Sequence, residues 1–268
     1  MCGRTACTLG PNDLINRCTK SLPKTSKKRP LKWVDNNHDG HVYTTSFNKA
    51  PGSVCPVLVA KEHLPKSADA GEEDDTEDSA EDICVFPMLW GLVPAWHDGH
   101  PQKHGLSTSN CRSEGMFEKK MFSQCLNEHR RCVILVDGFY EWKTEEVKSG
   151  AGKKSTSKQP YFIFHGSSSE QQDTPASEVK EPPSECKDTN SADSSSSLDA
   201  YSTAGIKSTI SQTTVIPPSP PSQILAIAGL FRIGSARAGE GRDPKNSLYS
   251  YSVITVPSSS TMDWLHHR

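Results

Sequence analysis

The chain has 268 residues, a formal net charge of −2 and a hydrophobic fraction of only 34%. This length allows one large domain or two small ones around a real core. The low apolar content excludes a chain that is folded core throughout. The absence of an apolar run long enough to span a bilayer excludes an integral helical membrane protein, so we expect no membrane partner.

Two segments account for the low apolar content. Residues 67–82 form an acidic low-complexity run with nine Asp or Glu and no Lys or Arg, and residues 166–221 are rich in Ser, Thr, Pro and Gln. Neither can bury enough apolar surface to offset the entropy of ordering the chain, so both are predicted to be disordered inserts.

The charge of the remaining chain is strongly basic. Without the two inserts it carries 27 basic and 15 acidic residues, a net charge of +12. Such a surface favours a polyanionic partner such as nucleic acid. The alternative is a domain whose charge is balanced by its own acidic loops.

The predicted elements alternate between many strands and few helices. A helix is predicted at 12–18, which starts with an Asn/Asp cap, and a second at 113–126, where apolar residues follow a Ser cap at near-helical spacing. Short apolar, β-branched or aromatic runs bounded by turn residues predict strands at 56–60, 83–93, 131–142, 160–166, 224–233 and 250–256. The fold class is therefore α+β, mainly β, in a single domain.

The long insert divides this domain in sequence. Strands before residue 165 must pair with strands after residue 222, so one domain closes around the insert. A site can then be assembled from both ends of the chain.

The cysteines indicate a reducing compartment. Nine are present, and no CxxC pair occurs among them: Cys2, Cys7, Cys18, Cys55, Cys84, Cys111, Cys125, Cys132 and Cys186. Without a signal peptide we expect thiols and not disulfides. His97, His100 and His104 lie in a Gly/Pro-broken polar stretch without a matched ligand pair, so we expect no metal and no other cofactor.

Cys2 directly follows the initiator methionine in the opening MCGRT. A small second residue normally allows Met1 to be removed. Cys2 would then carry a free α-amine and a thiol on adjacent carbons, and such a 1,2-aminothiol reacts with aldehydes. The alternative is an early cysteine without a special role.

Six motifs carry a resemblance to a known family. In chain order they are MCGRT (1–5), FNKAP (47–51), WGLVPAW (90–96), SNCRSE (109–114), DGFYEW (137–142) and LHHR (265–268). Together they resemble the SOS response-associated peptidase (SRAP) family, over residues 1–64, 83–165 and 222–268. The resemblance implies a single SRAP-type catalytic domain over 1–268, with a barrel-like antiparallel sheet and flanking helices. Relatives continue after this last motif with Met-Pro and further core sequence, so we expect a domain truncated at Arg268.

The family's chemistry implies a role for the terminal cysteine. Family members bond their mature N-terminal cysteine to the aldehyde of an abasic site in single-stranded DNA, first as an imine and then as a thiazolidine. The resemblance implies that Cys2 forms this DNA–protein crosslink after autoproteolytic removal of Met1. The crosslink would shield the lesion during replication-associated repair. Because an imine can proceed to β-elimination, we also expect weak strand cleavage (AP-lyase activity).

Three further catalytic residues are implied by the resemblance. Glu141 follows a buried apolar run, where its pKa can be raised for proton transfer. His266 resembles the family histidine that assists sugar ring opening, and Asn110 the asparagine that hydrogen-bonds near the cysteine. From the residues alone, the alternatives are a solvated edge glutamate, a frayed tail and a helix or turn cap.

Four DNA-binding residues are implied in the same way. Arg4, Arg112 and Arg268 match family arginines that hold the DNA backbone. Trp90 resembles the family residue on which bases or duplex ends stack. Trp96 and Trp142 receive no such role and are interpreted as core.

Other functions remain open at this stage. One is a cysteine peptidase with Cys2 as nucleophile and His266 and Glu141 as partners. Another is a non-covalent binder of modified-cytosine DNA, for which no aromatic cage is marked in the sequence. The expected partners are single-stranded DNA containing abasic sites and the replication-fork machinery. We expect a monomer in the nucleus, at chromatin and replication forks.

Overall fold

The computed structural model describes residues 3–21, 31–35, 42–64, 83–97, 99–148, 154–166, 223–235 and 247–267. The predicted inserts, apart from Gly166, lie outside these residues. Residues 1–167 and 219–268 form one unit, to which the following description applies. Among the described residues, no helix is long and apolar enough to cross a membrane.

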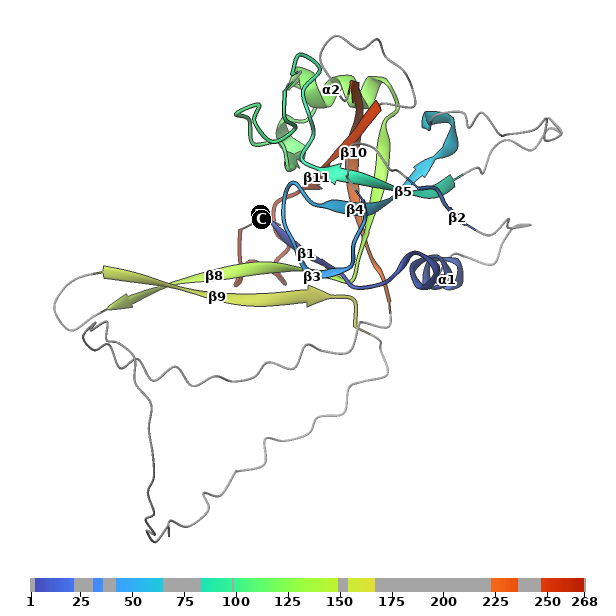
Figure 1. Cartoon of the computed structure of the whole chain (residues 1–268). Helices are drawn as coiled ribbons and strands as arrows, with labels where there is room; N and C mark the ends of the chain where they lie inside the picture. The colour runs from blue at the N-terminus through green and yellow to red at the C-terminus, as the bar shows by residue number, and fades with distance from the viewer. Residues whose placement is uncertain are drawn as a thin grey trace, which may run out of the picture. The chain divides into compact units, whose positions relative to one another are not determined.

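Five strands close into a barrel (Figure 1). They are β4 (Val54–Ala60), β5 (Ile83–Trp90), β7 (Arg131–Val136), β10 (Leu225–Ser235) and β11 (Ser247–Thr255). Neighbours pair antiparallel in the order β5, β4, β7, β10, β11, and a parallel pairing between β11 and β5 completes the ring. The pairing of β7 with β10 joins the chain across the long insert, as the sequence predicts. The mainly β, barrel-like fold is thus confirmed.

Two short strands extend the barrel sheet. β2 (Lys32–Trp33) pairs with β5, and β6 (Asn110–Arg112) pairs with β11, both in parallel. A 3-10 turn, η2 (Lys61–His63), follows β4.

Alternate side chains of the five strands fill the barrel. Because successive residues of a strand point to opposite faces, Phe86 and Trp90 of β5 point inward together with Tyr249 and Tyr251 of β11. Phe86 meets Tyr249 edge-on with ring centroids 4.8 Å apart, and Trp90 stacks on Tyr251 at 6.3 Å. The interior is therefore a packed core.

Two α-helices in the described part of the chain cover the outside of the barrel. α1 (Pro11–Ser21) begins with proline, whose missing N–H is no loss in the first turn, and packs Leu14 and Cys18 against Val85 and Leu135. The sequence predicted this helix at nearly the same place.

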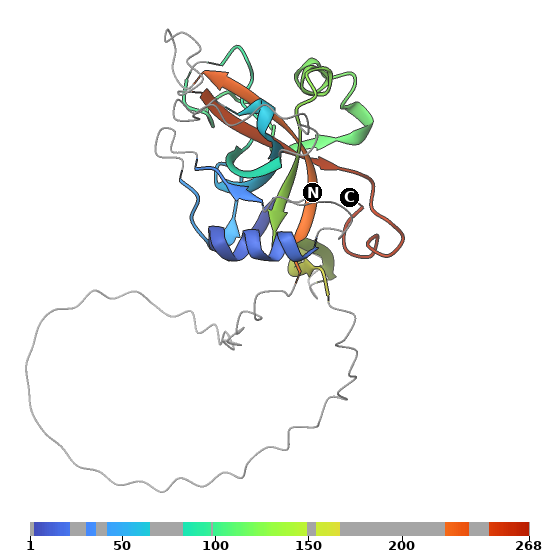
Figure 2. The ribbon, with the colours of Figure 1, turned by 90° about the vertical axis from the view of Figure 1, so that its right-hand side faces the viewer.

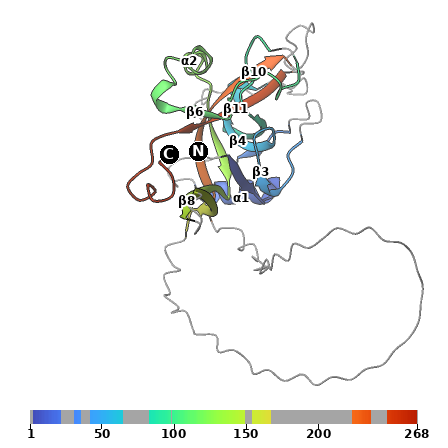
Figure 3. The same cartoon turned by 90° about the vertical axis from the view of Figure 1, so that its left-hand side faces the viewer.

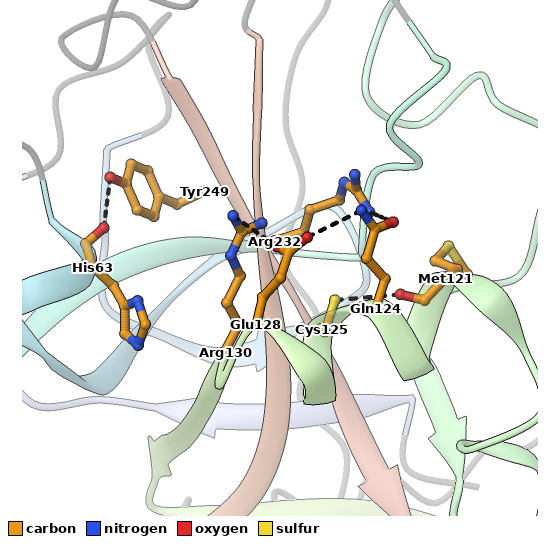
Figure 4. A network of polar contacts seen from close by, with 8 residues as sticks. All are labelled: His63, Met121, Gln124, Cys125, Glu128, Arg130, Arg232 and Tyr249. Atoms are coloured by element: carbon orange, nitrogen blue, oxygen red, sulfur yellow. Dashed lines mark hydrogen bonds and ion pairs between the residues drawn. The ribbon is translucent and has the colours of Figure 1, made fainter.

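The second helix begins later than predicted. A 3-10 turn, η4 (Ser113–Gly115), comes first, and α2 (Lys120–Asn127) follows. Figure 4 shows the polar contacts of α2: the Gln124 side chain accepts a hydrogen bond from Arg232 of β10 at 3.2 Å, and Arg130 pairs with Glu128 at 2.8 Å. The bond between Arg232 and Gln124 joins the helix to β10.

A second, four-stranded sheet packs against the barrel core. Its order is β3 (Ser46–Lys49), β1 (Arg4–Cys7), β8 (Gly138–Lys148) and β9 (Lys154–Phe164), all antiparallel. Cys7 and Phe139 on its inner face join the cluster that fills the barrel. Figure 1 shows β8 and β9 extending as a long hairpin beyond β1 and β3.

The predicted single strand at 131–142 is two strands that meet at Asp137. The Asp137 backbone N–H donates to the Ala6 carbonyl at 2.8 Å, and its carboxylate accepts from the Thr8 backbone N–H at 2.6 Å. These two bonds turn the chain from the barrel strand β7 into the second sheet, against β1. The buried Asp137 carboxylate thus has a hydrogen-bond donor in the turn that it stabilises.

The cysteines of the described residues are all buried free thiols, as the sequence predicts for them. Burial raises the pKa of Cys18, Cys111 and Cys125 to about 11, from an ordinary value of 9.0. Each thiol is thus neutral in the folded protein at pH values where it ionises in the unfolded chain.

This difference predicts a loss of stability in alkaline solution. Below pH 9 the thiols are neutral in both states; between about pH 9 and 11 the unfolded state releases their protons first, so the free energy of unfolding falls. Melting followed by circular dichroism at pH 8 to 11 should show this fall, and a shallower one in Cys18→Ala. A slope unaffected by Cys18→Ala would contradict the assignment for that thiol.

Candidate active site

The start of β1 is placed by its pairing with β8. Arg4 lies opposite Tyr140 and Thr5 opposite Phe139 in antiparallel register. Continuing this register by one residue brings Gly3, the first described residue, opposite Glu141. The reactive residue predicted from the sequence, Cys2, lies outside the described residues, immediately before Gly3.

Glu141 is almost completely buried, with 6% of its surface exposed. It lies on β8 opposite Tyr161 of β9, and its carboxylate accepts a hydrogen bond from the Trp142 backbone N–H at 3.4 Å. Glu141 does not directly follow the buried apolar run of β7, contrary to the expectation from the sequence; β8 starts after the turn at Asp137 and carries Glu141 within the second sheet.

His266 belongs to a closed turn formed by residues 256–267. The Ser258 N–H donates to the His267 carbonyl at 3.1 Å, and the His266 N–H donates to the Met262 carbonyl at 3.2 Å. The His266 ring is half-buried and stacks on His267 with centroids 4.4 Å apart. The structure therefore holds this histidine in an ordered turn.

The turn lies beside the start of β1. Figures 2 and 3 both show this turn, in red, beside the β8–β9 hairpin, in yellow-green. Trp264 of the turn meets Tyr161 edge-on, with ring centroids 5.0 Å apart, and Tyr161 is the cross-strand partner of Glu141. Gly3, Glu141 and the turn that carries His266 are thus brought together from the two ends and the middle of the chain.

Asn110 and Arg112 lie on β6, beside the end of β11 from which the turn begins. Asn110 lies opposite Val253, and Arg112 lies opposite Thr255, the last residue of β11. Residues 256–267 follow directly, so β6 flanks the base of the turn. The Asn110 side chain is half-buried and that of Arg112 is exposed.

Arg4 is exposed at the start of β1, where it donates a hydrogen bond to the Asn48 side chain at 3.1 Å. Two exposed guanidinium groups, those of Arg4 and Arg112, thus lie on strands at this end of the molecule. Arg268, the third arginine predicted to bind DNA, lies outside the described residues.

The stacking role predicted for Trp90 does not fit its position. Trp90 is 1% exposed, stacks on Tyr251 in the barrel and donates its indole N–H to the Ser109 carbonyl at 3.0 Å. A base cannot reach either face of this ring. Trp90 faces inward because it continues the alternation of inward-facing side chains along β5.

Trp96 is an exposed aromatic side chain whose exposure was not predicted from the sequence. It is 67% exposed, so its interpretation as core is wrong, whereas Trp142 is half-buried. Trp96 meets His97 edge-on at 5.8 Å, and His97 meets His104 at 5.5 Å. The signal available in the sequence was Pro94, which separates Trp96 from the strand before it.

No metal-binding arrangement is found among the described residues: they contain no group of three or more His, Cys, Asp or Glu side chains placed to share an ion. Burial and the neighbouring His97 lower the pKa of His104. Its ring nitrogens contact the Leu106 N–H at 3.1 Å and the Thr108 hydroxyl at 3.5 Å. These histidines shape the loop before β6.

The fold and the site together define a single-barrel, mainly β protein with polar residues gathered around its N-terminus. The chain belongs to the SOS response associated peptidase (SRAP) family, whose model matches residues 1–268. The resemblance predicted from the six motifs is thus confirmed.

Curated relatives agree with this assignment. The chain is 34% identical over 269 residues to the abasic site processing protein HMCES of Xenopus tropicalis and 32% identical to that of Rattus norvegicus, covering all of this chain and 61% and 60% of those proteins. It is 33% identical over 84 residues to the abasic site processing protein YedK of Escherichia coli, which is 31% of either chain. The chain thus spans about 60% of the length of the two HMCES relatives.

A substitution of Gly138, at the start of β8, tests how closely β8 packs against β9. A Cβ atom at this position would collide with the Ile163 carbonyl oxygen and lie 2.6 Å from Phe162 Cζ, both on β9. We expect Gly138→Ala to cost about 1–3 kcal/mol of stability. Differential scanning calorimetry should show a lower melting temperature than in Gly166→Ala, where a Cβ meets nothing within 4 Å. Equal melting temperatures would show that β8 and β9 do not pack this closely.

Proposed function

We propose that this protein recognises abasic sites in single-stranded DNA and forms a covalent thiazolidine with them through Cys2 after loss of Met1. Membership of the SRAP family and similarity to abasic site processing proteins support abasic-site processing. The observation that carries the proposal for this chain is the pairing of Arg4 with Tyr140, whose register brings Gly3 opposite Glu141.

The proposed chemistry uses both nucleophiles of a terminal cysteine. The α-amine adds to the aldehyde carbon of the ring-opened sugar, and loss of one water gives an imine. The thiol sulfur then adds to the imine carbon, and its proton passes to the nitrogen. The result is a five-membered ring, with no net oxidation or reduction. An internal cysteine lacks the free amine, so removal of Met1 must come first.

Glu141 and His266 are proposed to move the protons. Glu141 is shielded from bulk water, so its carboxylate can exchange a proton with the amine and the carbinolamine without competition from solvent. Histidine exchanges protons near neutral pH, so His266 can protonate the sugar ring oxygen during ring opening. Asn110 would hydrogen-bond the reacting groups from β6.

The remaining predicted residues are proposed to hold DNA. The exposed guanidinium groups of Arg4 and Arg112 can grip phosphates with paired hydrogen bonds; Arg268 keeps this role as a prediction. The exposed ring of Trp96 replaces Trp90 as the proposed base-stacking surface.

We propose that the same residues remove Met1, with the Cys2 thiol as nucleophile. This step is where the peptidase and crosslinking functions meet, because hydrolysis after Met1 exposes the aminothiol. Weak strand cleavage would arise from imines that the thiol fails to trap. We place the activity at replication forks in the nucleus, where single-stranded DNA is exposed, and expect the protein to act as a monomer.

An insertion at the N-terminus tests the terminal aminothiol. Placing an alanine between Met1 and Cys2 should abolish crosslinking to an oligonucleotide with one abasic site, because the thiol then has no adjacent free amine. Affinity for the undamaged oligonucleotide should stay the same. Denaturing gels quantify the adduct, and Cys186→Ala, which removes a thiol from the predicted insert, is the control that should crosslink normally. Retained crosslinking in the insertion variant would exclude the thiazolidine mechanism.

Binding to undamaged single-stranded DNA should depend strongly on salt, because neutralised phosphates release counterions. Arg112→Glu should weaken binding for every sequence alike and reduce the slope of log K against log salt by roughly one unit. Fluorescence anisotropy at several salt concentrations measures both. Lys32→Glu reverses an exposed charge on β2 and should change binding less. An affinity that varied with base sequence and ignored salt would refute the phosphate-contact model.

A further inference from the structure

Leu265 and Trp264 of the turn formed by residues 256–267 both contact the rest of the described molecule. Leu265 is 5% exposed and anchors the turn in the protein interior. Trp264 is 53% exposed, yet its ring meets Tyr161 of β9 edge-on at 5.0 Å. The two anchors precede His266 directly, one buried and one at the surface.

The surface anchor shares a face with Glu141. Glu141 and Tyr161 are directly opposite each other on β8 and β9, so their side chains point to the same side of the hairpin. Lys143 lies two residues after Glu141 and therefore on that side as well, with its Nζ 5.7 Å from the centre of the Trp264 ring. Trp264 is thus held between two neighbours of Glu141.

The backbone of the turn transmits this attachment to His266. The His266 N–H is bonded to the Met262 carbonyl at 3.2 Å, and the Ser258 N–H to the His267 carbonyl at 3.1 Å. The Ser258 hydroxyl also donates to the Asp263 carboxylate. Because these bonds close the turn on itself, it moves as one piece, and the position of Trp264 sets that of His266.

We infer that Trp264 is a positioning residue that clamps the C-terminal turn onto the β8–β9 hairpin and so sets the place of His266 relative to Glu141. This inference rests on the proposed function. A purely stabilising role would be expected of a buried tryptophan, whereas half of this ring is exposed and the turn already has a core anchor in Leu265. Loss of the ring removes the contact that joins the turn carrying His266 to Tyr161, and so loosens the placement of His266 relative to Glu141.

The test compares the chemical step with DNA binding in the full chain. At saturating concentrations of an oligonucleotide with one abasic site, Trp264→Ala should lower the rate constant for adduct formation by about tenfold, because small misplacements of a catalytic group are costly. The dissociation constant for the matching undamaged oligonucleotide should stay unchanged. Trp264→Phe keeps a ring against Tyr161 and should restore most of the rate. Phe117→Ala removes a 70% exposed aromatic ring outside the proposed site and should affect neither quantity.

A double variant tests the contact itself. If Tyr161 acts through Trp264, Trp264→Ala combined with Tyr161→Ala should be no slower than the slower of the two single variants, whereas independent roles would multiply the two losses. Melting temperatures of all variants establish that each is folded.

Three results would overturn the inference. An unchanged rate in Trp264→Ala would show that the ring does not position His266. A weaker dissociation constant with a normal rate at saturation would make Trp264 a DNA-contact residue instead. Failure of Trp264→Phe to recover the rate would exclude a role for the aromatic contact. If the wild-type chain forms no adduct at all, the proposed function fails, which is distinct from all three.

Discussion

The antiparallel pairing of β1 with β8 is the constraint on which the site depends. β1 has only four residues, and on its own it could not fix the start of the chain. Its register with β8 and the two hydrogen bonds around Asp137 hold it in place between β3 and β8. Gly3, the first described residue, is therefore held opposite Glu141.

The barrel provides the rigid support for this arrangement. β11 closes the ring by pairing with β5 and then leads directly into the turn that carries His266. The same strand also pairs with β6, which carries Asn110 and Arg112. The residues proposed to act together thus lie on β6, on β8 and on the turn that follows β11.

The strands that could be predicted from the sequence are those long enough to show a run of apolar residues bounded by turn residues. The runs at 56–60, 83–93 and 224–233 correspond to β4, β5 and β10. β1, β2, β3 and β6 were not predicted because they have two to four residues, too few to show alternation, and they exist only through pairing with distant strands. The division of 131–142 was missed for a related reason: Asp137 ends β7 through bonds to β1, which is more than a hundred residues away in sequence.

The residues of the site could be predicted from the sequence, but their positions in the fold could not. Motif order identified the family and singled out Glu141, Asn110 and His266, but sequence could not tell a frayed tail at His266 from the closed turn that the structure contains. The burial of Trp90 and the exposure of Trp96 were not predicted, because burial depends on strand alternation and on where the strand ends. The contact between Trp264 and Tyr161 joins segments a hundred residues apart, and no local pattern indicates it.

The proposed chemistry requires the mature N-terminus of this chain to become covalently attached to an abasic site. Intact mass spectrometry of the purified chain, before and after incubation with a single-stranded oligonucleotide bearing one abasic site, detects this attachment. We expect loss of the mass of Met1, followed by a one-to-one adduct of protein and oligonucleotide minus one water, with the modification mapped to Cys2. A retained Met1, or a processed chain that forms no adduct, would contradict the proposed chemistry.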